Sequence, residues 1–131
     1  MSRTVKEINW QNYLFKAKQF KNTADDAYVK RSWNSVGLNA VHSAISANDA
    51  LVVYHTNLRS TSDNHHDAVN LLIKALNNED DARSNAKHVS WLINRKNLIE
   101  YESRLFYENE ANEALKHADR FLTWVAGRLP K

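Results

Sequence analysis

The sequence predicts an all-α fold, an antiparallel bundle of about five helices in a single domain spanning residues 1–131. Apolar residues recur every three or four positions along almost the whole chain, which is the spacing of one helix face. Only two glycines and one proline are present, too few for the many tight turns of an all-β chain. A length of 131 residues with 43% hydrophobic content suits one domain with one core.

The first helix is expected over about residues 6–28 and the second over about 32–56. The second carries two apolar stripes, so we expect it to be buried on two sides and to lie at the centre of the bundle. One stripe consists of Trp33, Val36, Ala40, Ala44, Ala47, Leu51 and Tyr54, and the other consists of Leu38, Val41, Ile45 and Val52.

The three remaining helices follow a polar stretch. The third begins near His65, and the run NNEDD at 77–81 ends it and caps the fourth, which is expected to reach about residue 97. Residues 98–106 predict a partly extended connection. The fifth helix is expected over about 107–128, because a glycine and a proline mark its end. Short connections between five helices favour an antiparallel arrangement.

Composition excludes several classes of function. Cysteine is absent, which excludes disulfides, thiolate metal sites and a thiol nucleophile. No apolar run reaches the roughly 20 residues of a membrane span, and the opening MSRTVKEINW lacks the apolar core of a signal peptide. We therefore expect no membrane contact and a cytoplasmic address. The net charge of +3 permits contact with nucleic acid or nucleotide phosphates but does not demand it.

The candidate chemistry lies in the stretch LRSTSDNHH, residues 58–66. Each of the three polar residues before His65 has a side chain that can cap the third helix, and Asn64 with Asp67 resembles a capping box. With any of these caps, His65 and His66 fall in the first helical turn. The positive end of the helix dipole lies there, so we expect neutral imidazoles.

These side chains are the parts that a metal-free ribonuclease needs. A neutral histidine can take a proton from a ribose 2′-OH, and a helix N-terminus attracts phosphate. Arg59 can place two parallel hydrogen bonds on a phosphate group. The alternative is an ordinary helix cap with solvated charges, and the spacing alone does not separate the two.

A carboxylate on the second helix belongs to the same hypothesis. His42, Ser46 and Asp49 share one helix face that borders apolar residues. A carboxylate beside apolar residues is either paired or functional. Asp49 therefore either caps or forms a local ion pair, with Arg59 as a candidate partner, or it orients Arg59 or a histidine in a site between the second and third helices.

Other polar patterns predict no further site. Glu113 and His117 lie one turn apart on the fifth helix, but the second such pair that a di-iron bundle requires is missing from the sequence. We expect no metal and no cofactor. Arg83 and His88 are interpreted as surface groups of the fourth helix. With two glycines in the chain, a glycine-rich phosphate loop is excluded.

Residues 40–72, AVHSAISANDALVVYHTNLRSTSDNHHDAVNLL, resemble the HEPN superfamily of small all-helical domains. The resemblance covers nearly the whole chain, from INWQNYLFKAKQF to KNLIEYESRLFYENEANEALKHADRFLTWV. The mark of that family is an arginine followed, after four to six residues, by a histidine. Arg59 is separated by five residues from His65 and by six from His66. Ser60 follows the arginine, where many active members have Asn, Asp or His.

The resemblance implies a helical homodimer in which the arginine and histidine of both subunits line one cleft. It further implies a metal-independent endoribonuclease of a toxin–antitoxin or phage-defence system, often paired with a nucleotidyltransferase-like antitoxin. Arg59 would then hold the phosphate and His65 would transfer the proton. His66 is the alternative or second proton carrier, and Asp49 matches the orienting residue of the preceding helix.

Two expectations concern assembly. Large apolar groups such as Trp91, Phe106 or Trp124 would suit a dimer interface if they lay on an exposed face. The alternative to a nuclease is a non-catalytic dimeric helical module that binds a nucleotide or a protein partner.

Overall fold

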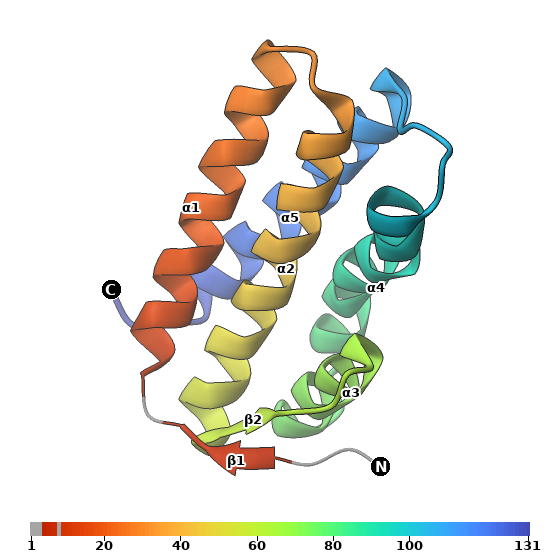
Figure 1. The fold of residues 1–131 in the computed structure, drawn as a ribbon. Coiled ribbons are helices and arrows are strands. Elements are labelled where there is room, and N and C mark those ends of the chain that lie inside the picture. Colours follow the sequence, from red (N-terminus) through yellow and green to blue (C-terminus); the bar gives the residue numbers. More distant parts are fainter. Residues whose placement is uncertain (1–3, 8) are drawn as a thin grey trace.

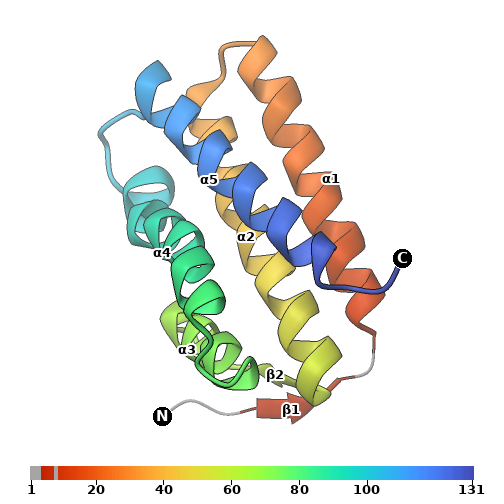
Figure 2. The same ribbon diagram turned by 180° about the vertical axis from the view of Figure 1, so that it is seen from behind.

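The structure, a computed structural model, describes residues 4–7 and 9–131 and confirms the all-α prediction (Figure 1). Long helices run alternately in opposite directions, and one short helix lies at one end of the bundle (Figures 1 and 2). Within the described part of the chain, no helix has the length and apolar character needed to cross a membrane. The elements in chain order are β1 (Thr4–Lys6), α1 (Trp10–Val29), α2 (Trp33–Thr56), β2 (Leu58–Ser60), α3 (His65–Ala75), α4 (Asp80–Tyr101) and α5 (Glu108–Gly127).

Helix α2 is the central helix, as its two apolar stripes predict. It packs against α1, α3, α4 and α5, and more than half of its residues are buried. Many of the buried residues are alanines, which let neighbouring helices approach closely. The Ser43 hydroxyl donates a 2.7 Å hydrogen bond to the Ala17 carbonyl of α1 and so satisfies one buried polar group between the two helices.

The N-terminal segment differs from the prediction. Helix α1 begins at Trp10 rather than near residue 6, because Thr4–Lys6 pairs with Leu58–Ser60 as a two-stranded antiparallel sheet. Ile8, which the predicted helix included, lies outside the described residues. The pairing sets Val5 opposite Arg59. Each strand has three residues, which is too short to produce a recognisable alternation in the sequence.

The turn from α2 into β2 explains why α2 ends where predicted. Asn57 adopts a left-handed conformation with φ of 57°, and its backbone N–H donates to the Val53 carbonyl. Asparagine tolerates this conformation better than most residues, so it ends helices well. The chain therefore reverses at once, and Arg59 follows in a paired strand instead of in an open loop.

Helix α4 continues four residues beyond the predicted end. Leu98 and Ile99 pack against the core, and Phe106 is buried. A Cβ atom at position 37 would lie 2.9 Å from Ile99 Cδ1 and 2.8 Å from Phe106 Cε2, so only Gly37 admits both side chains. This packing extends α4 over residues that were expected to form part of the connection.

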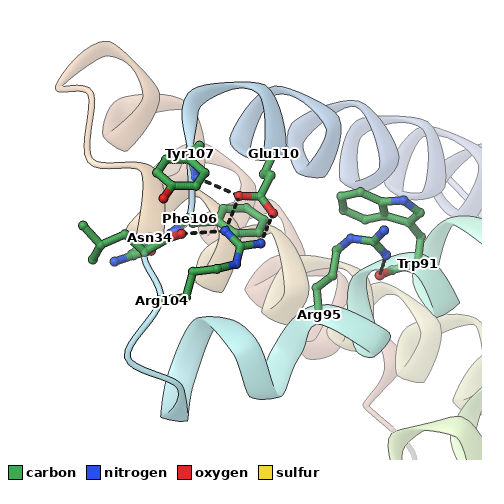
Figure 3. Close-up of polar contacts among 8 residues, drawn as sticks. Asn34, Trp91, Arg95, Arg104, Phe106, Tyr107 and Glu110 are labelled. Atoms are coloured by element: carbon green, nitrogen blue, oxygen red, sulfur yellow. Dashed lines mark hydrogen bonds and ion pairs between the residues drawn. The ribbon is translucent and has the colours of Figure 1, made fainter.

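Specific polar contacts fix the connection between α4 and α5 (Figure 3). Arg104 binds Glu110 with 2.6 Å between Nη2 and Oε2, and Glu110 Oε1 accepts from the Tyr107 backbone N–H at 3.0 Å. The Phe106 backbone N–H donates to Asn34 Oδ1 of α2 at 2.8 Å. The connection is therefore bonded to both α2 and α5.

The aromatic residues considered for a dimer interface pack within the chain instead. Phe106 is 3% exposed, and Trp91 and Trp124 are half-buried against the core. The Trp124 indole N–H donates to Asp81 Oδ2 at 2.8 Å. These three residues therefore do not form the exposed apolar face that would have suited a dimer interface. The dimer itself stays a prediction.

Candidate functional site

A network of short polar contacts fixes the start of α3. Asn64 is the N-cap, and its Oδ1 accepts from the His66 backbone N–H at 3.0 Å. Asp67 does not complete the capping box; its carboxylate accepts a 2.6 Å hydrogen bond from the Ser62 hydroxyl. The Ser62 oxygen in turn accepts from the Asn64 backbone N–H at 3.1 Å. His65 and His66 therefore stand in the first turn of α3, as predicted.

Arg59 is held from two sides by residues of the long helices. Its Nε donates to Asp49 Oδ2 of α2 at 3.2 Å. Its guanidinium carbon lies 5.4 Å from the centre of the Tyr13 ring of α1, within the range of a cation–π contact. Tyr13 is fixed in turn by a 3.2 Å hydrogen bond from its hydroxyl to Glu7. Because Asp49 binds Nε, this bond leaves the two terminal amino groups of the guanidinium out of the ion pair.

Asp49 is a buried carboxyl group with an unusual proton affinity. It is 6% exposed, and burial raises its pKa to about 6, although the charge and hydrogen bond of Arg59 act in the opposite direction. The local ion pair considered for Asp49 is present, and it joins α2 to the strand that carries Arg59. A carboxyl group with this pKa can hold or release a proton near neutral pH.

Three of the four predicted site residues line one cavity. Asp49, Arg59 and His65 surround a space of about 460 Å³ between α2, β2 and the start of α3. Lys96 of α4 also lines it. The cavity thus combines a guanidinium, an ammonium, a buried carboxyl and an imidazole at a helix N-terminus, which is a suitable set for binding and reacting with a phosphodiester.

His65 has the protonation state that a general base needs. Burial lowers its pKa, and Lys96 and His42 lower it further, while Glu100 acts in the opposite direction. The direction agrees with the predicted neutral imidazole. Burial is the leading cause, however, whereas the sequence argument relied on the helix end.

His66 is separated from Arg59. It lines a neighbouring cavity of about 280 Å³ together with His65 and Lys96, and the cavity that contains Arg59 is not lined by it. The two adjacent histidines were interchangeable in the sequence motif. The structure distinguishes them, because only His65 borders both cavities.

Lys96 is the cavity residue that the sequence reasoning missed. Its Nζ lies 2.9 Å from Glu100 Oε2, and Glu100 Oε1 lies 3.7 Å from His42 Nε2. Lys96 and Glu100 are four residues apart, a spacing that ordinary surface ion pairs share. Glu100 was also placed in a connection instead of a helix. The four-residue spacing of Lys96 and Glu100 was the only indication in the sequence, and it does not show that α4 packs beside α3.

A second histidine cluster lies between α4 and α5. The Nδ1 atoms of His88 and His117 are 2.9 Å apart, so the interpretation of His88 as a surface group is wrong. Trp91 stacks on His117 with 4.5 Å between ring centres. The Arg95 guanidinium lies 3.6 Å from the Trp91 ring centre, and Figure 3 shows Arg95 beside Trp91. Arg83 is a surface group as predicted and contacts Asp80. Across residues 4–7 and 9–131, no group of three or more His, Asp or Glu side chains could hold a metal ion.

Comparison of the chain with models of known protein families, with curated proteins and with solved structures gives no significant match in any of the three. Function is therefore inferred from the chemistry of the cavity itself.

Proposed function

We propose that the cavity at the start of α3 is the active site of a HEPN-like, metal-independent endoribonuclease. The observation that supports this most is the shared cavity of Arg59, Asp49 and His65, three residues from three different elements. A cation, a tunable carboxyl and a neutral imidazole in one accessible space provide phosphate binding and proton transfer without a metal.

In the proposed reaction, neutral His65 takes the proton of a ribose 2′-OH. The 2′-oxygen forms a bond to the adjacent phosphorus while the bond from phosphorus to the 5′-oxygen breaks. The products are a 2′,3′-cyclic phosphate and a 5′-hydroxyl. The terminal amino groups of Arg59 bind the non-bridging oxygens, where charge grows in the transition state. This division of labour is consistent with Asp49 binding the guanidinium through Nε.

The leaving 5′-oxygen needs a proton from a second group. Asp49, with its pKa raised to about 6 by burial, carries a proton in a useful fraction of molecules near neutral pH. It also orients Arg59 through the hydrogen bond from Nε to Oδ2, which does not require the carboxyl group to be ionised. His66, in the adjoining cavity, is the alternative donor. In a homodimer, a second set of the same side chains would line a common cleft.

The biological setting that we propose is a toxin–antitoxin or phage-defence system, with a nucleotidyltransferase-like antitoxin as partner. Expression of the wild-type chain should then slow cell growth. Arg59→Ala should relieve this effect, and so should the double variant His65→Ala with His66→Ala.

A non-catalytic module that binds a nucleotide is the second candidate. One observation favours it: the Arg59 guanidinium already has Asp49 as a partner, and a paired arginine binds phosphate without any proton transfer. Purified wild-type protein that binds a nucleotide but leaves RNA intact would establish this alternative.

The deciding experiment measures cleavage of a mixed-sequence RNA in EDTA, with the mass of the protein in solution determined alongside. Wild type should cleave, and Arg59→Ala should lose cleavage. Arg83→Ala is the matched control, because Arg83 is a surface arginine that also precedes a histidine by a few residues on another element. Loss of activity in EDTA, or equal activity in the two arginine variants, would contradict the proposal.

A further inference from the structure

The two polar cavities beside His65 form one continuous surface. The first, of about 460 Å³, contains Arg59 and Asp49, and the second, of about 280 Å³, contains His66. Asp63, His65 and Lys96 line both. Binding sites for small ligands begin at roughly 300 Å³; the first cavity exceeds this volume and the second lies just below it, so together they suit two consecutive units of a linear ligand.

The second cavity differs from the first in its chemistry. It is lined by the side-chain amides of Asn94 and Asn97 from α4, beside the apolar Ile93. Asn94 and Asn97 are three residues apart and so share a helix face, and both are exposed. Each amide offers donors and an acceptor, which is what recognition of a base edge requires, and an isoleucine side chain offers an apolar surface to a base plane.

Lys96 stands where the two cavities meet, and its position suggests a phosphate contact. Its ammonium carries three donors, of which the Glu100 pair at 2.9 Å uses one. Asp63 lies at the same junction. Its carboxylate repels a phosphate and accepts hydrogen bonds from a base amino group or a ribose hydroxyl. The junction therefore orients a bound single strand of nucleic acid, with its phosphate toward Lys96 and its sugar or base toward Asp63.

We infer that the second cavity binds the nucleotide next to the scissile phosphate, with Lys96 contacting the backbone phosphate between the two nucleotides and Asn94 and Asn97 recognising the base edge. This inference rests on the proposed ribonuclease function and specifies its substrate as single-stranded RNA, because a base must be unpaired to present its edge to the two amides. Lys96 is a substrate-binding residue, and Asn94 and Asn97 determine base preference.

The test uses binding, so it does not depend on cleavage. Fluorescein-labelled 2′-O-methyl hexanucleotides of A, C or U lack the reactive 2′-OH and remain intact. Fluorescence anisotropy should show that wild type binds the three sequences with different affinities. Lys96→Met should weaken all three equally, by about tenfold, and should reduce the slope of log affinity against log salt by about 0.7. Lys96→Arg should retain binding. The double variant Asn94→Ala with Asn97→Ala should reduce the affinity for the preferred base by about fivefold or more and should reduce the differences in affinity among the three sequences.

Two controls on α4 complete the design. Lys87→Met removes an exposed lysine outside both cavities, and Asn85→Ala removes an amide that bonds to Asp81 of its own helix. Both should bind as wild type does. The inference is overturned if the Lys96 and asparagine variants stay within about twofold of these controls, if wild type does not rank the sequences, or if it does not bind them.

Failure of the inference and failure of the proposed function are distinguishable. A wild type that cleaves RNA, with cleavage and binding unaffected by the Lys96 and asparagine changes, retains the function and loses the inference. A wild type that binds the hexanucleotides in the predicted manner but leaves RNA intact retains the assignment of Lys96, Asn94 and Asn97 to RNA binding and loses the nuclease.

Discussion

Two regions of this molecule place partly buried histidines between helices, and they differ in what surrounds the imidazoles. His65, at the start of α3, opens onto a cavity that also contains Arg59 and Asp49. His88 and His117, between α4 and α5, face each other with 2.9 Å between their Nδ1 atoms. Trp91 stacks on His117 from one side. Burial is the leading cause of a lowered pKa for all three histidines.

The difference teaches that a lowered imidazole pKa is a poor guide to function by itself. Both regions have it, because any histidine that loses water disfavours its charged form. The His65 region adds an anchored guanidinium and an accessible space, whereas the Nδ1 atoms of the His88–His117 pair contact each other. The first region has the composition of a reaction site and the second that of a packing contact between two helices.

The largest expected difference between the two regions is in catalysis. His65→Ala should reduce kcat/KM for RNA cleavage by about 100-fold or more, because it removes the general base. His88→Ala should leave cleavage within about twofold of wild type, since His88 does not border either polar cavity. Initial rates on a fluorescent single-stranded RNA measure both. Comparable losses in the two variants would mean that the structural distinction between the regions has no functional counterpart.

Asp49 gives the next largest effect, on stability. Burial raises its pKa from an ordinary 3.8 to about 6, so the folded chain holds this proton more tightly than the unfolded chain. The stability that the proton contributes is fully present below pH 3.8 and is lost as the pH rises to about 6. The displacement of the Asp49 pKa corresponds to about 3 kcal/mol in the free energy of unfolding.

Asp49→Asn should remove this loss. Its free energy of unfolding should exceed that of wild type by about 1–2 kcal/mol at pH 8, a gain reduced by the weaker interaction with Arg59. Arg59 is partly exposed and stays hydrated without the carboxylate. Urea denaturation at pH 5 and pH 8 measures the change. A variant less stable than wild type at pH 8 would show that the ion pair outweighs the cost of burying the carboxylate.

The sequence predicted the fold well where an apolar pattern repeats over many residues, and poorly where contacts with distant segments determine the local conformation. The two stripes of α2 identified the central helix, because more than half of that helix is buried by neighbours on several sides. The strand pair β1–β2 was missed because three residues cannot display a period. Residues 98–101 were misassigned because their helical state depends on the contact of Ile99 with the position of Gly37, which is distant in the sequence.

The candidate site shows the same limit. The spacing of Arg59 and His65 and the start of α3 are local features, so the sequence located them, although it left the cap open among three polar residues and the structure selects Asn64. The apolar neighbours of Asp49 indicated a carboxylate that is either paired or functional, and the structure shows the pair with Arg59. Lys96 could not be found in this way, because a periodic pattern reports the faces of one helix and does not report which helix lies opposite. The separation of His65 from His66 likewise depends on where α4 packs.

A smaller effect is expected from the cap that positions His65. Asn64→Ala removes the acceptor for the His66 backbone N–H and should reduce the free energy of unfolding by about 1 kcal/mol. Cleavage should fall only to the extent that the first turn of α3 frays. Asn39→Ala is the matched control, because the Asn39 amide donates a solvent-exposed hydrogen bond to a carbonyl within its own helix and caps no helix end. Urea midpoints of the two variants measure the difference, and equal midpoints would show that the cap does not hold this turn.

The smallest expected effect concerns the His88–His117 pair and its response to acid. Their pKa values are lowered, mainly by burial, with the Arg120 charge acting in the same direction on both, while Arg95 lowers and Glu113 raises the pKa of His117. Stability from these imidazoles is therefore fully present above their unfolded pKa of 6.5 and is lost as the pH falls through the lower folded values. This sign is opposite to that of Asp49.

Replacing both histidines of this pair with glutamine should make the loss of stability below pH 6.5 shallower. It should not abolish the loss, because burial also lowers the pKa values of His42, His55 and His65. Thermal unfolding midpoints between pH 5 and pH 7 measure the slope. Two imidazoles whose nitrogens share one hydrogen bond cannot both be protonated without breaking it. If the dependence of stability on pH in acid is the same in the double variant as in wild type, the contact between α4 and α5 opens before either ring takes a proton.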